Sequence, residues 1–494
     1  MTAPGRPRLH LLGGAVSIVL GEGLFFPTGL LTVAFLTRRL GPEGYGLLVL
    51  AMAPVLWVEW SIAALFARAT VKLTGDAGDW RPLGAGIVRV HLVIGAAAAA
   101  LLALAAGPLA ALLGEPALAG YLRLFSLDVP LLALIHAHRG LLVGAGGYRQ
   151  RGLASACRWT ARLLLIVTLV GLGLSVEGAI LGSIGASLVE LAVLRGYVRP
   201  PLLGRAPMAV AGLWTYATPL FLSTVSLRLV DRLDLFMLRL LGVGVDGVGA
   251  YGAAQNLALA PRVFSLALSS LVLASLSHAQ RAGDHRVAAG LVRDAQRATV
   301  VLLPLAALAA GAAPEIVSLL LGPVYAASAG TLAVLLPGAV AAVSLSVTAV
   351  LLTAAGRPGW TVPLAWAMLP LAGAGHLLAI PRAGPLGAAI VTSGCTLLGA
   401  AAGMWLVRRA WAVAPPAATA VRSLALAAGT YLVAAAWPTP GVWVLLKLAA
   451  LAGAVAVGFV LLGEVRLGDL APAWRAIARR DVVRRLEGKV PTTR

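Results

Sequence analysis

Long runs without a charged residue constrain the fold of this 494-residue chain more than any other feature. Residues 92–114, 383–407 and 423–446 contain no Asp, Glu, Lys or Arg. Because about 20 apolar residues in a helix cross the hydrocarbon core of a bilayer, each run is long enough for one span. The run 316–356 is long enough for two, with Gly322-Pro323 as the turn between them. These runs predict an all-α, polytopic integral membrane protein.

The composition agrees with this prediction. The chain is 60% hydrophobic and 12% charged, with a mean hydropathy of +0.92, whereas a soluble domain carries about 25% charged residues. The net charge of +20 raises the alternative of a nucleic-acid partner. Basic residues of membrane proteins gather in cytoplasmic loops, however, so we expect no nucleic-acid partner. The two cysteines, Cys157 and Cys395, indicate neither a disulfide framework nor a metal site.

Hydropathy divides the chain into about 14 transmembrane helices, with the N-terminal apolar stretch retained as the first. The predicted spans are 12–36, 45–67, 90–113, 118–142, 159–175, 178–196, 213–241, 247–276, 296–321, 328–354, 359–380, 384–407, 421–437 and 441–463. Twelve transmembrane helices with two re-entrant segments are the alternative, and this count is also even.

Basic residues recur at every second connection, which predicts the orientation. They are Arg6 and Arg8; Arg68, Lys72 and Arg81; Arg149, Arg151 and Arg158; Arg195, Arg199 and Arg205; Arg281, Arg286 and Arg293; Arg357; and Arg408, Arg409 and Arg422. We therefore expect both termini on the cytoplasmic side of a bacterial inner membrane. The intervening loops hold few basic residues beyond Arg38, Arg39, Arg239 and Arg382.

Three pairs of segments resemble one another in the same order at an offset of about 201 to 209 residues. They are 38–46 with 240–252, 139–150 with 349–360, and 176–191 with 385–399. This repetition predicts two six-helix lobes in parallel orientation around a central cavity. In the first pair, we interpret Gly41-Pro42 as a sharp turn and Tyr45 as an anchor at headgroup depth.

The repeat leads to a division of the chain into five parts. They are an N-terminal lobe 1–196, a cytoplasmic linker 197–212, a C-terminal lobe 213–407, two further helices in 408–463 and a basic tail 464–494. Leu470, Trp474, Ala478, Val482 and Leu486 recur every four residues in the tail. That spacing favours an amphipathic helix on an anionic membrane surface, with a solvated basic tail as the alternative.

Several of these segments together resemble a known family. The stretch LTRRLGPEGYGLLVLA (36–51) resembles the N-terminal signature of the polysaccharide biosynthesis (Wzx-like) flippases. Those proteins belong to the multidrug/oligosaccharidyl-lipid/polysaccharide exporter superfamily. The resemblance covers most of 10–410, and it continues through PLFLSTVSLRLVDRLDLFMLRLLGVGVDGVGAYGAA (219–254), VLLTAAGRPGW (350–360) and IPRAGPLGAAIVTS (380–393).

This resemblance implies movement of a lipid-linked saccharide, joined through polyprenyl pyrophosphate, from the inner to the outer leaflet by alternating access. Its implied partners are that glycan and the bilayer, with a polysaccharide polymerase as a candidate, and it implies neither an enzyme nor a cofactor. A drug or metabolite antiporter and a lipid II flippase of the same superfamily are the alternatives. Lipid II flippases carry several cavity arginines in the N-terminal half, where this chain offers mainly Glu22 and Glu59 in its first two helices.

Ionisable residues at membrane depth are candidate functional residues, because they usually face a cavity or one another. Predicted helix 213–241 carries Arg228, Asp231, Arg232 and Asp234 within about half of its circumference. An arginine there could hold a pyrophosphate bidentately while a carboxylate binds a proton or cation. An internal salt-bridge ladder explains the same pattern.

Four further residues are candidates. Arg123 and Asp128 in predicted helix 118–142 and Arg262 in 247–276 are candidates for substrate binding, and Glu22 is a candidate for ion coupling. We expect Glu59, Glu190, Glu315 and Lys447 to lie nearer the membrane interfaces. The chain has no Gly-x4-Gly-Lys-Ser/Thr loop for ATP. Its short outer loops also argue against a membrane glycosyltransferase or polymerase.

Overall fold

The computed structural model describes residues 17–77, 79–200 and 232–464. Regular secondary structure within these ranges is entirely helical. Eight helices in them are long and apolar enough to cross a membrane. The helices His285–Gly311 and Ala313–Leu320, bent by 67°, make a ninth if they form one broken span. The predicted all-α polytopic membrane fold is confirmed, and the count of fourteen stays a prediction.

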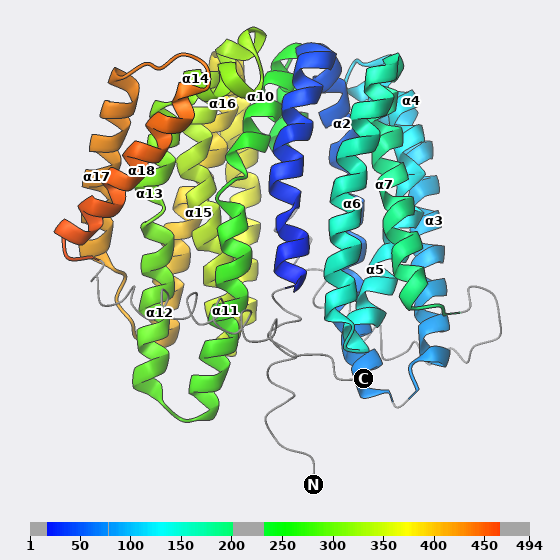
Figure 1. Ribbon diagram of the computed structural model, residues 1–494, viewed down its shortest axis with the longest axis horizontal. Helices are drawn as coiled ribbons and strands as arrows, with labels where there is room; N and C mark the ends of the chain where they lie inside the picture. Colours follow the sequence, from blue (N-terminus) through cyan, green and yellow to red (C-terminus); the bar gives the residue numbers. More distant parts are fainter. Residues whose placement is uncertain (1–16, 78, 201–231, 465–494) are drawn as a thin grey trace, which may run out of the picture.

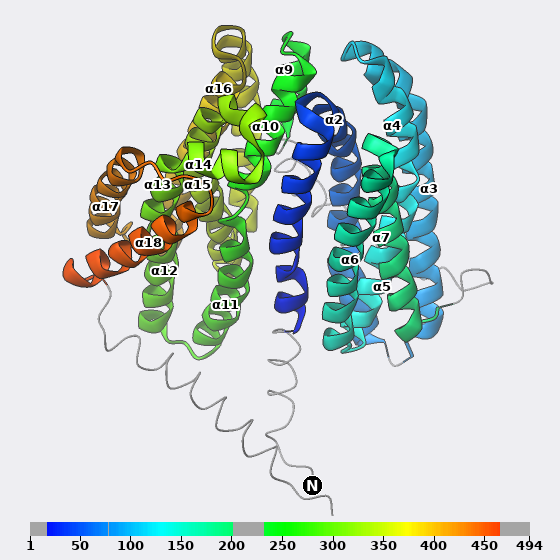
Figure 2. The same cartoon turned by 45° about the horizontal axis from the view of Figure 1, so that its top comes forward.

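The N-terminal bundle consists of α2 to α7 (Figure 1). Its helices are α2 (Phe25–Asp76), α3 (Arg81–Leu112), α4 (Pro116–Ser126), α5 (Asp128–Gly144), α6 (Tyr148–Leu169) and α7 (Ser175–Tyr197), with the π-helical turn η1 (Val170–Leu174) between the last two. They pack closely on one another, and α2 is the member that faces the rest of the molecule (Figure 2).

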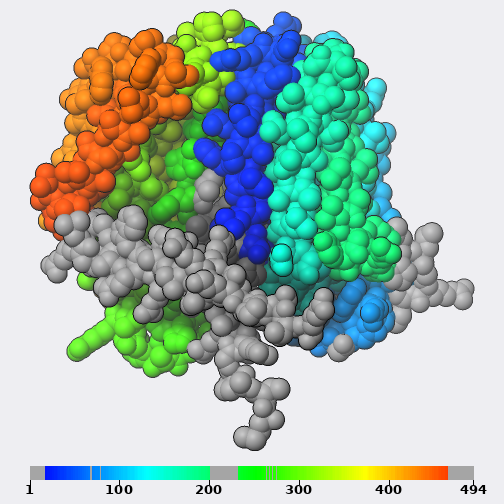
Figure 3. Space-filling view, viewed as in Figure 1, coloured from blue at the N-terminus to red at the C-terminus, as the bar shows by residue number. Residues whose placement is uncertain are grey.

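The C-terminal bundle consists of α9 to α16. Its elements are α9 (Leu233–Leu240), α10 (Val245–Ala258), α11 (Arg262–Arg281), α12 (His285–Val300), α13 (Leu303–Gly311), α14 (Ala313–Leu320), η2 (Pro323–Ser328), α15 (Ala329–Ala354), η3 (Pro358–Trp360) and α16 (Thr361–Trp411). The last two helices, α17 (Ala417–Ala436) and α18 (Trp443–Leu461), pack against α13 and cover one flank of this bundle (Figure 3). The five-part division predicted for the chain stays a prediction.

Glycines in the left-handed region of φ mark the turns at the predicted repeat. Gly41 (φ 67°) and Gly242 (φ 87°) lie in the first pair of similar segments, and Gly146 (φ 82°) and Gly356 (φ 73°) lie in the second. Just before the third pair come Gly173 (φ 97°) and Gly384 (φ 52°). A residue with a Cβ is strained at such φ values, so these turns favour glycine. The two halves therefore turn at equivalent positions.

The two bundles meet mainly where α2 packs on α10. A Cβ added to Gly46 would lie 2.1 Å from the Val245 carbonyl oxygen, and one added to Gly249 would lie 1.9 Å from that of Pro42. Both backbones are thus in direct contact, as small residues permit between membrane helices. We call the end of the molecule that holds Gly41, Gly114, Gly242 and Gly322 the corner end; it lies uppermost in Figure 1.

Three predicted boundaries were wrong. The connection 143–158 is short because α6 already begins at Tyr148. The span 247–276 is interrupted between Ala258 and Arg262, and the span 296–321 is broken at Ala312, where the helix axis bends by 67°. Tyr45 is no headgroup anchor either: it is buried between the bundles, with 3% of its surface exposed. The predicted span 118–142 agrees with one continuous candidate span, Pro116–Gly144, which consists of α4 and α5.

Candidate functional site

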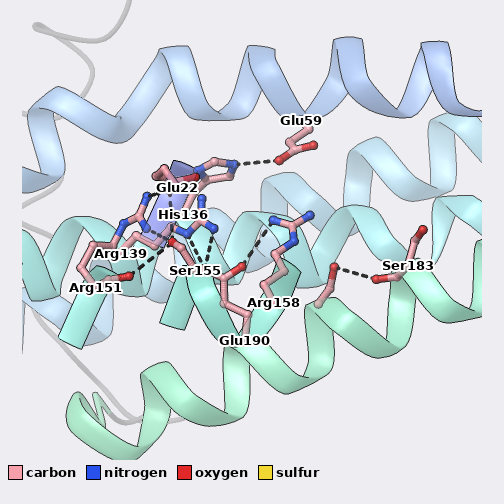
Figure 4. A network of polar contacts seen from close by, with 10 residues as sticks. Glu22, Glu59, His136, Arg139, Arg151, Ser155, Arg158, Ser183 and Glu190 are labelled. Atoms are coloured by element: carbon pink, nitrogen blue, oxygen red, sulfur yellow. Dashed lines mark hydrogen bonds and ion pairs between the residues drawn. The ribbon is translucent and has the colours of Figure 1, made fainter. Parts of the chain in front are cut away.

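A network of charged side chains lies inside the N-terminal bundle (Figure 4). We call it the ionic network; its members are Glu22, Glu59, Asp128, His136, Arg139, Arg151, Ser155, Arg158, Arg162, Ser183 and Glu190. They come from the helical stretch 17–23 and from α2, α5, α6 and α7. Residues far apart in the sequence therefore form one polar cluster within helices that are long and apolar enough to cross a membrane.

Glu22 is bound by two side chains of α6. Arg151 donates from Nη2 to Glu22 Oε1 at 2.6 Å, and the Ser155 hydroxyl donates to the same oxygen at 3.1 Å. Arg151 also donates from Nη1 to Ser155 Oγ. The carboxylate that the sequence left without a local partner thus has one 129 positions along the chain.

Glu190 of α7 binds two arginines from different helices. Its side chain is fully buried. Arg139 of α5 donates from Nε to Oε1 at 2.6 Å, and Arg158 of α6 donates from Nη1 to Oε2 at 3.4 Å. The expectation that Glu190 lies near a membrane interface stays a prediction. Within the bundle, its carboxylate links α5, α6 and α7.

Two other carboxylates complete the network. Glu59 Oε1 of α2 lies 3.5 Å from His136 Nε2 of α5. Asp128, at the start of α5, is 3% exposed and accepts a hydrogen bond from the Ser187 side chain of α7. Its Oδ1 has no hydrogen-bond partner among the residues that the structure describes. Arg162 of α6 donates to the Ser183 hydroxyl at 3.5 Å.

Charge balance makes this network tolerable inside a membrane. The four carboxylates Glu22, Glu59, Asp128 and Glu190 stand against four arginines, at positions 139, 151, 158 and 162. A charged side chain at the bilayer centre costs about 2.5–3.5 kcal/mol on insertion scales, and pairing offsets much of that cost. A cation or proton that neutralised one carboxylate would release an arginine, which could then bind an anion bidentately.

A second polar group surrounds Asp234 in the C-terminal bundle. Asp234 is 2% exposed. Its Oδ2 accepts hydrogen bonds from the Tyr251 hydroxyl at 2.5 Å, from Gln255 Nε2 at 2.8 Å and from the Thr392 hydroxyl at 3.2 Å. Its Oδ1 accepts from the backbone N–H of Leu235 at 2.9 Å. Three helices, α9, α10 and α16, meet at this carboxylate.

Arg232 extends this group toward the other bundle. Its guanidinium donates to Gln255 Oε1 at 2.5 Å and to Asn256 Oδ1 at 3.1 Å. Asn256 in turn donates from Nδ2 to the Tyr45 hydroxyl of α2 at 2.8 Å. A continuous polar chain therefore runs from Asp234 to the N-terminal bundle.

The predicted stripe on helix 213–241 needs correction. Arg232 has φ 76° and caps α9, which begins at Leu233, so no regular helix continues through it. Arg232 and Asp234 therefore do not belong to one helical stripe, contrary to the prediction, although both side chains contact Gln255. Arg228 and Asp231 lie outside the described residues.

The other predicted site residues do not lie together in the structure. Arg123 is exposed on α4, whereas Asp128 is buried at the start of α5. They are five positions apart, so they lie on different faces of the helical stretch Pro116–Gly144. Arg262 begins α11 directly after Pro261 and is half-buried. Lys447, expected near an interface, is 1% exposed and donates to Glu315 Oε1 at 2.6 Å, which ties α18 to α14.

Sequence reasoning missed the arginines of the network. Arg151 and Arg158 were counted as loop charges, although both lie in α6 with Arg162. Their spacing of 151, 155, 158 and 162 places Arg151, Ser155, Arg158 and Arg162 on one helical face. That periodicity was the available signal. Within the described ranges, no three His, Cys, Asp or Glu side chains form a possible metal site.

The chain matches the family model described as "Polysaccharide biosynthesis protein" over residues 35–330, which is more than half of its length. No curated protein matches the sequence.

Solved structures share the fold. One described as "Lipid II flippase MurJ, inward closed conformation" is similar with a TM-score of 0.73 and 13% identity, over 93% of this chain and 100% of the other. An inward-facing MATE-family multidrug resistance transporter of the MOP superfamily is similar with a TM-score of 0.57 and 15% identity, over 80% of this chain and 94% of the other. A MOP superfamily transporter from Pyrococcus furiosus is similar with a TM-score of 0.58 and 13% identity, over 83% of this chain and 96% of the other. At these identities the likeness shows the fold alone.

Proposed function

Because this chain belongs to the polysaccharide biosynthesis protein family, we propose that it is a lipid-linked oligosaccharide flippase of the bacterial cytoplasmic membrane. Family and fold together make it a multi-span membrane flippase or transporter. In the proposal it moves a polyprenyl-pyrophosphate-linked oligosaccharide from the inner to the outer leaflet for surface polysaccharide synthesis. It acts as a transporter, without enzymatic activity or a cofactor.

The observation that carries this proposal is the family match across residues 35–330. This segment includes the α2 corner, most of the ionic network and the Asp234 group. A structure described as a lipid II flippase is similar over nearly the whole chain. Lipid II is itself a lipid-linked saccharide, so a fold of this kind suits the proposed class of substrate.

The orientation follows from the basic residues. The loops at the end opposite the corners carry most of them, among them Arg81, Arg281 and Arg286. Under the positive-inside rule, that end is cytoplasmic and the corner end faces outward. The bundles join at the corner end, as expected of a transporter that takes up its substrate from the cytoplasmic leaflet.

We assign the coupling ion to Glu22, whose partner Arg151 neutralises it in this state. Neutralisation of Glu22 by a proton or cation frees Arg151 for the pyrophosphate of the substrate. Arg232 and Asp234 supply the polar contacts on the C-terminal side. This arrangement couples binding of the anionic substrate to the ion through a shared arginine. Arg228 and Asp231, which lie outside the described residues, stay candidates for substrate binding.

A deletion strain tests the function directly. Lipid-linked intermediates are extracted from mutant and wild type and compared by mass spectrometry. Accumulation of a polyprenyl-pyrophosphate oligosaccharide, with loss of the surface polymer, is the expected result. Re-expression of the full chain should restore both.

Two other outcomes would reject the proposal. An unchanged lipid pool with altered sensitivity to cationic drugs would favour the drug antiporter. A structure described as a multidrug resistance MATE family transporter shares the fold. Accumulation of the peptidoglycan precursor lipid II alone would favour a lipid II flippase.

A further inference from the structure

Two arginines at the corner end connect the bundles in opposite directions. Arg38 of α2 donates from Nη2 to the carbonyl oxygen of Leu319 in α14 at 2.5 Å. Arg239 of α9 donates from Nη2 to Glu115 Oε1 at 2.8 Å and to the carbonyl oxygen of Gly114 at 3.4 Å. Each bundle thus extends one arginine to the other.

These arginines occupy equivalent positions in the repeat. Arg38 lies three residues before Gly41, in the segment RRLG, and Arg239 lies three residues before Gly242, in RLLG. Both glycines have a positive φ. The corner of each half therefore presents its arginine in the same way, which a chance surface contact would not require.

The acceptors are equivalent as well. Gly114 closes the sequence Leu-Leu-Gly at the end of α3, and Gly322 closes the same sequence at the end of α14. Both glycines have a positive φ, 65° and 99°. A Cβ added to Gly114 would lie 3.3 Å from Arg239 Nη2, and one added to Gly322 would lie 3.8 Å from Arg38 Cγ. Each arginine lies over the turn of the opposite bundle.

The chemistry of these turns explains the choice of arginine. The last carbonyls of a helix lack intrahelical donors and carry the negative end of the helix dipole. A guanidinium satisfies such oxygens with charge-assisted hydrogen bonds, and Glu115 adds a full negative charge on one side only. The contacts between the bundles are hydrogen bonds and an ion pair, which can form and break repeatedly.

We propose that Arg38 and Arg239 form a reciprocal latch that holds the corner end closed and is released on both sides when the bundles separate there. The latch accounts for two of the four arginines that depart from the expected charge distribution. The inference rests on the proposed function in one respect, that the corner end opens during transport.

Distance measurements between the bundles test the latch. The full-length protein, with Cys157 and Cys395 replaced by alanine, receives spin labels at Ala117→Cys and Ala327→Cys. Both alanines are exposed at the corner end, after Gly114 and Gly322 respectively. Double electron–electron resonance in nanodiscs then gives the populations of closed and open distances in Arg38→Ala, Arg239→Ala and the double variant.

Each single replacement should raise the ratio of open to closed molecules by roughly 3- to 10-fold, as expected for a charge-assisted contact at a partly exposed site. The double variant should show about the product of the two effects, because separate contacts add in free energy. Glu115→Gln, which keeps the side-chain shape, should shift the ratio in the same direction by less.

Neighbouring arginines provide matched controls. Arg39 lies beside Arg38, but its guanidinium is 5.9 Å from the ring of Phe35 in the same helix. Arg382 donates to the Leu378 carbonyl of its own helix. Arg39→Ala and Arg382→Ala should leave the distances unchanged. An unchanged distribution in the double variant, or an equal shift in the controls, would overturn the latch.

These measurements need no substrate, so they separate the latch from the proposed function. A lipid pool that does not change on deletion overturns the flippase and leaves the distances to be judged on their own. Distances that do not respond to the arginines overturn the latch and leave the flippase standing.

Discussion

Asn256 of α10 donates from Nδ2 to the phenolic oxygen of Tyr45 in α2 at 2.8 Å, and this hydrogen bond joins the two bundles at a buried position. Tyr45 belongs to the corner of the N-terminal bundle, and Asn256 also accepts from Arg232. The bond is thus the point at which the polar group around Asp234 reaches the other half of the molecule.

Tyr45→Phe should lower the free energy of unfolding by about 0.5–1.5 kcal/mol, the usual net value of one hydrogen bond, because the Asn256 amide loses its acceptor. Thermal unfolding in detergent measures the change. A double-mutant cycle with Asn256→Ala provides the check. If the two effects simply add, the bond does not contribute to stability.

Glu190→Gln should be the most destabilising conservative change in the ionic network. It removes the carboxylate that Arg139 and Arg158 share, and breaking a buried pair costs about 3–5 kcal/mol. The measurement is the unfolding temperature of the purified protein. Glu177→Gln is the matched control, because Glu177 is exposed on the same helix α7. Equal losses in both variants would contradict the assignment.

Glu22→Gln and Arg151→Gln should each abolish export while the protein level in the membrane stays normal, because both remove the proposed coupling pair. The readout is surface polysaccharide in the deletion strain complemented with each variant. The exchanged pair Glu22→Arg with Arg151→Glu distinguishes the roles. If the doubly exchanged variant exports polysaccharide again, the salt bridge is purely structural and the ion-coupling assignment is wrong.

Gly249→Ala should force the bundles apart at the corner end, because its Cβ would lie 1.9 Å from the Pro42 carbonyl oxygen and backbone there cannot yield locally. We expect loss of export in the complementation assay with a folded protein by size-exclusion chromatography. Gly120→Ala is the control, since nothing lies within 4 Å of its added Cβ. Normal export by Gly249→Ala would contradict a close backbone crossing.

Glu464, which follows α18, should make the stability of the α17 contact depend on pH. Burial by itself raises its pKa, but hydrogen bonds from Thr419, Arg422 and Arg297 outweigh burial and hold the pKa below the ordinary value of 4.5. A lowered pKa in the folded state means that the stabilisation is present above the unfolded value of about 4.3 and is lost as the pH falls through the folded value.

The measurement is the unfolding temperature between about pH 7 and pH 3, a range that spans the ordinary pKa of a glutamate. Wild type should lose stability at the acid end. Glu464→Gln should have a lower unfolding temperature than wild type at about pH 7. Its unfolding temperature should fall less between about pH 7 and pH 3, because a glutamine side chain does not titrate. Identical pH profiles for the two proteins would show that Glu464 does not contribute.

The helical membrane fold followed from the sequence because it depends on local properties. A run such as 92–114 is apolar over its whole length, and no tertiary contact is needed to know that water is a poor solvent for it. The corner at Gly41 was predictable for the same reason, since glycine is what permits a positive φ within a turn.

The local sequence could not predict the ion-pair partners of the charged residues. Arg139 and Glu190 are separated by 51 positions in the chain and Glu22 and Arg151 by 129, so only packing of the helices brings them together. A local signal also gave a wrong helix boundary. Arg149 and Arg151 are typical of a basic loop, but α6 continues through them, and Arg151 donates hydrogen bonds to Glu22 and Ser155.

By itself, the sequence determined that this chain is a set of apolar membrane helices joined by glycine-containing turns, because hydropathy and backbone freedom are properties of short segments. Only the tertiary structure decided which carboxylate neutralises which arginine and which arginine crosses to the other half. The physical reason is that the free energy of a charge in a membrane depends on its neighbours in space, and those neighbours lie on other helices.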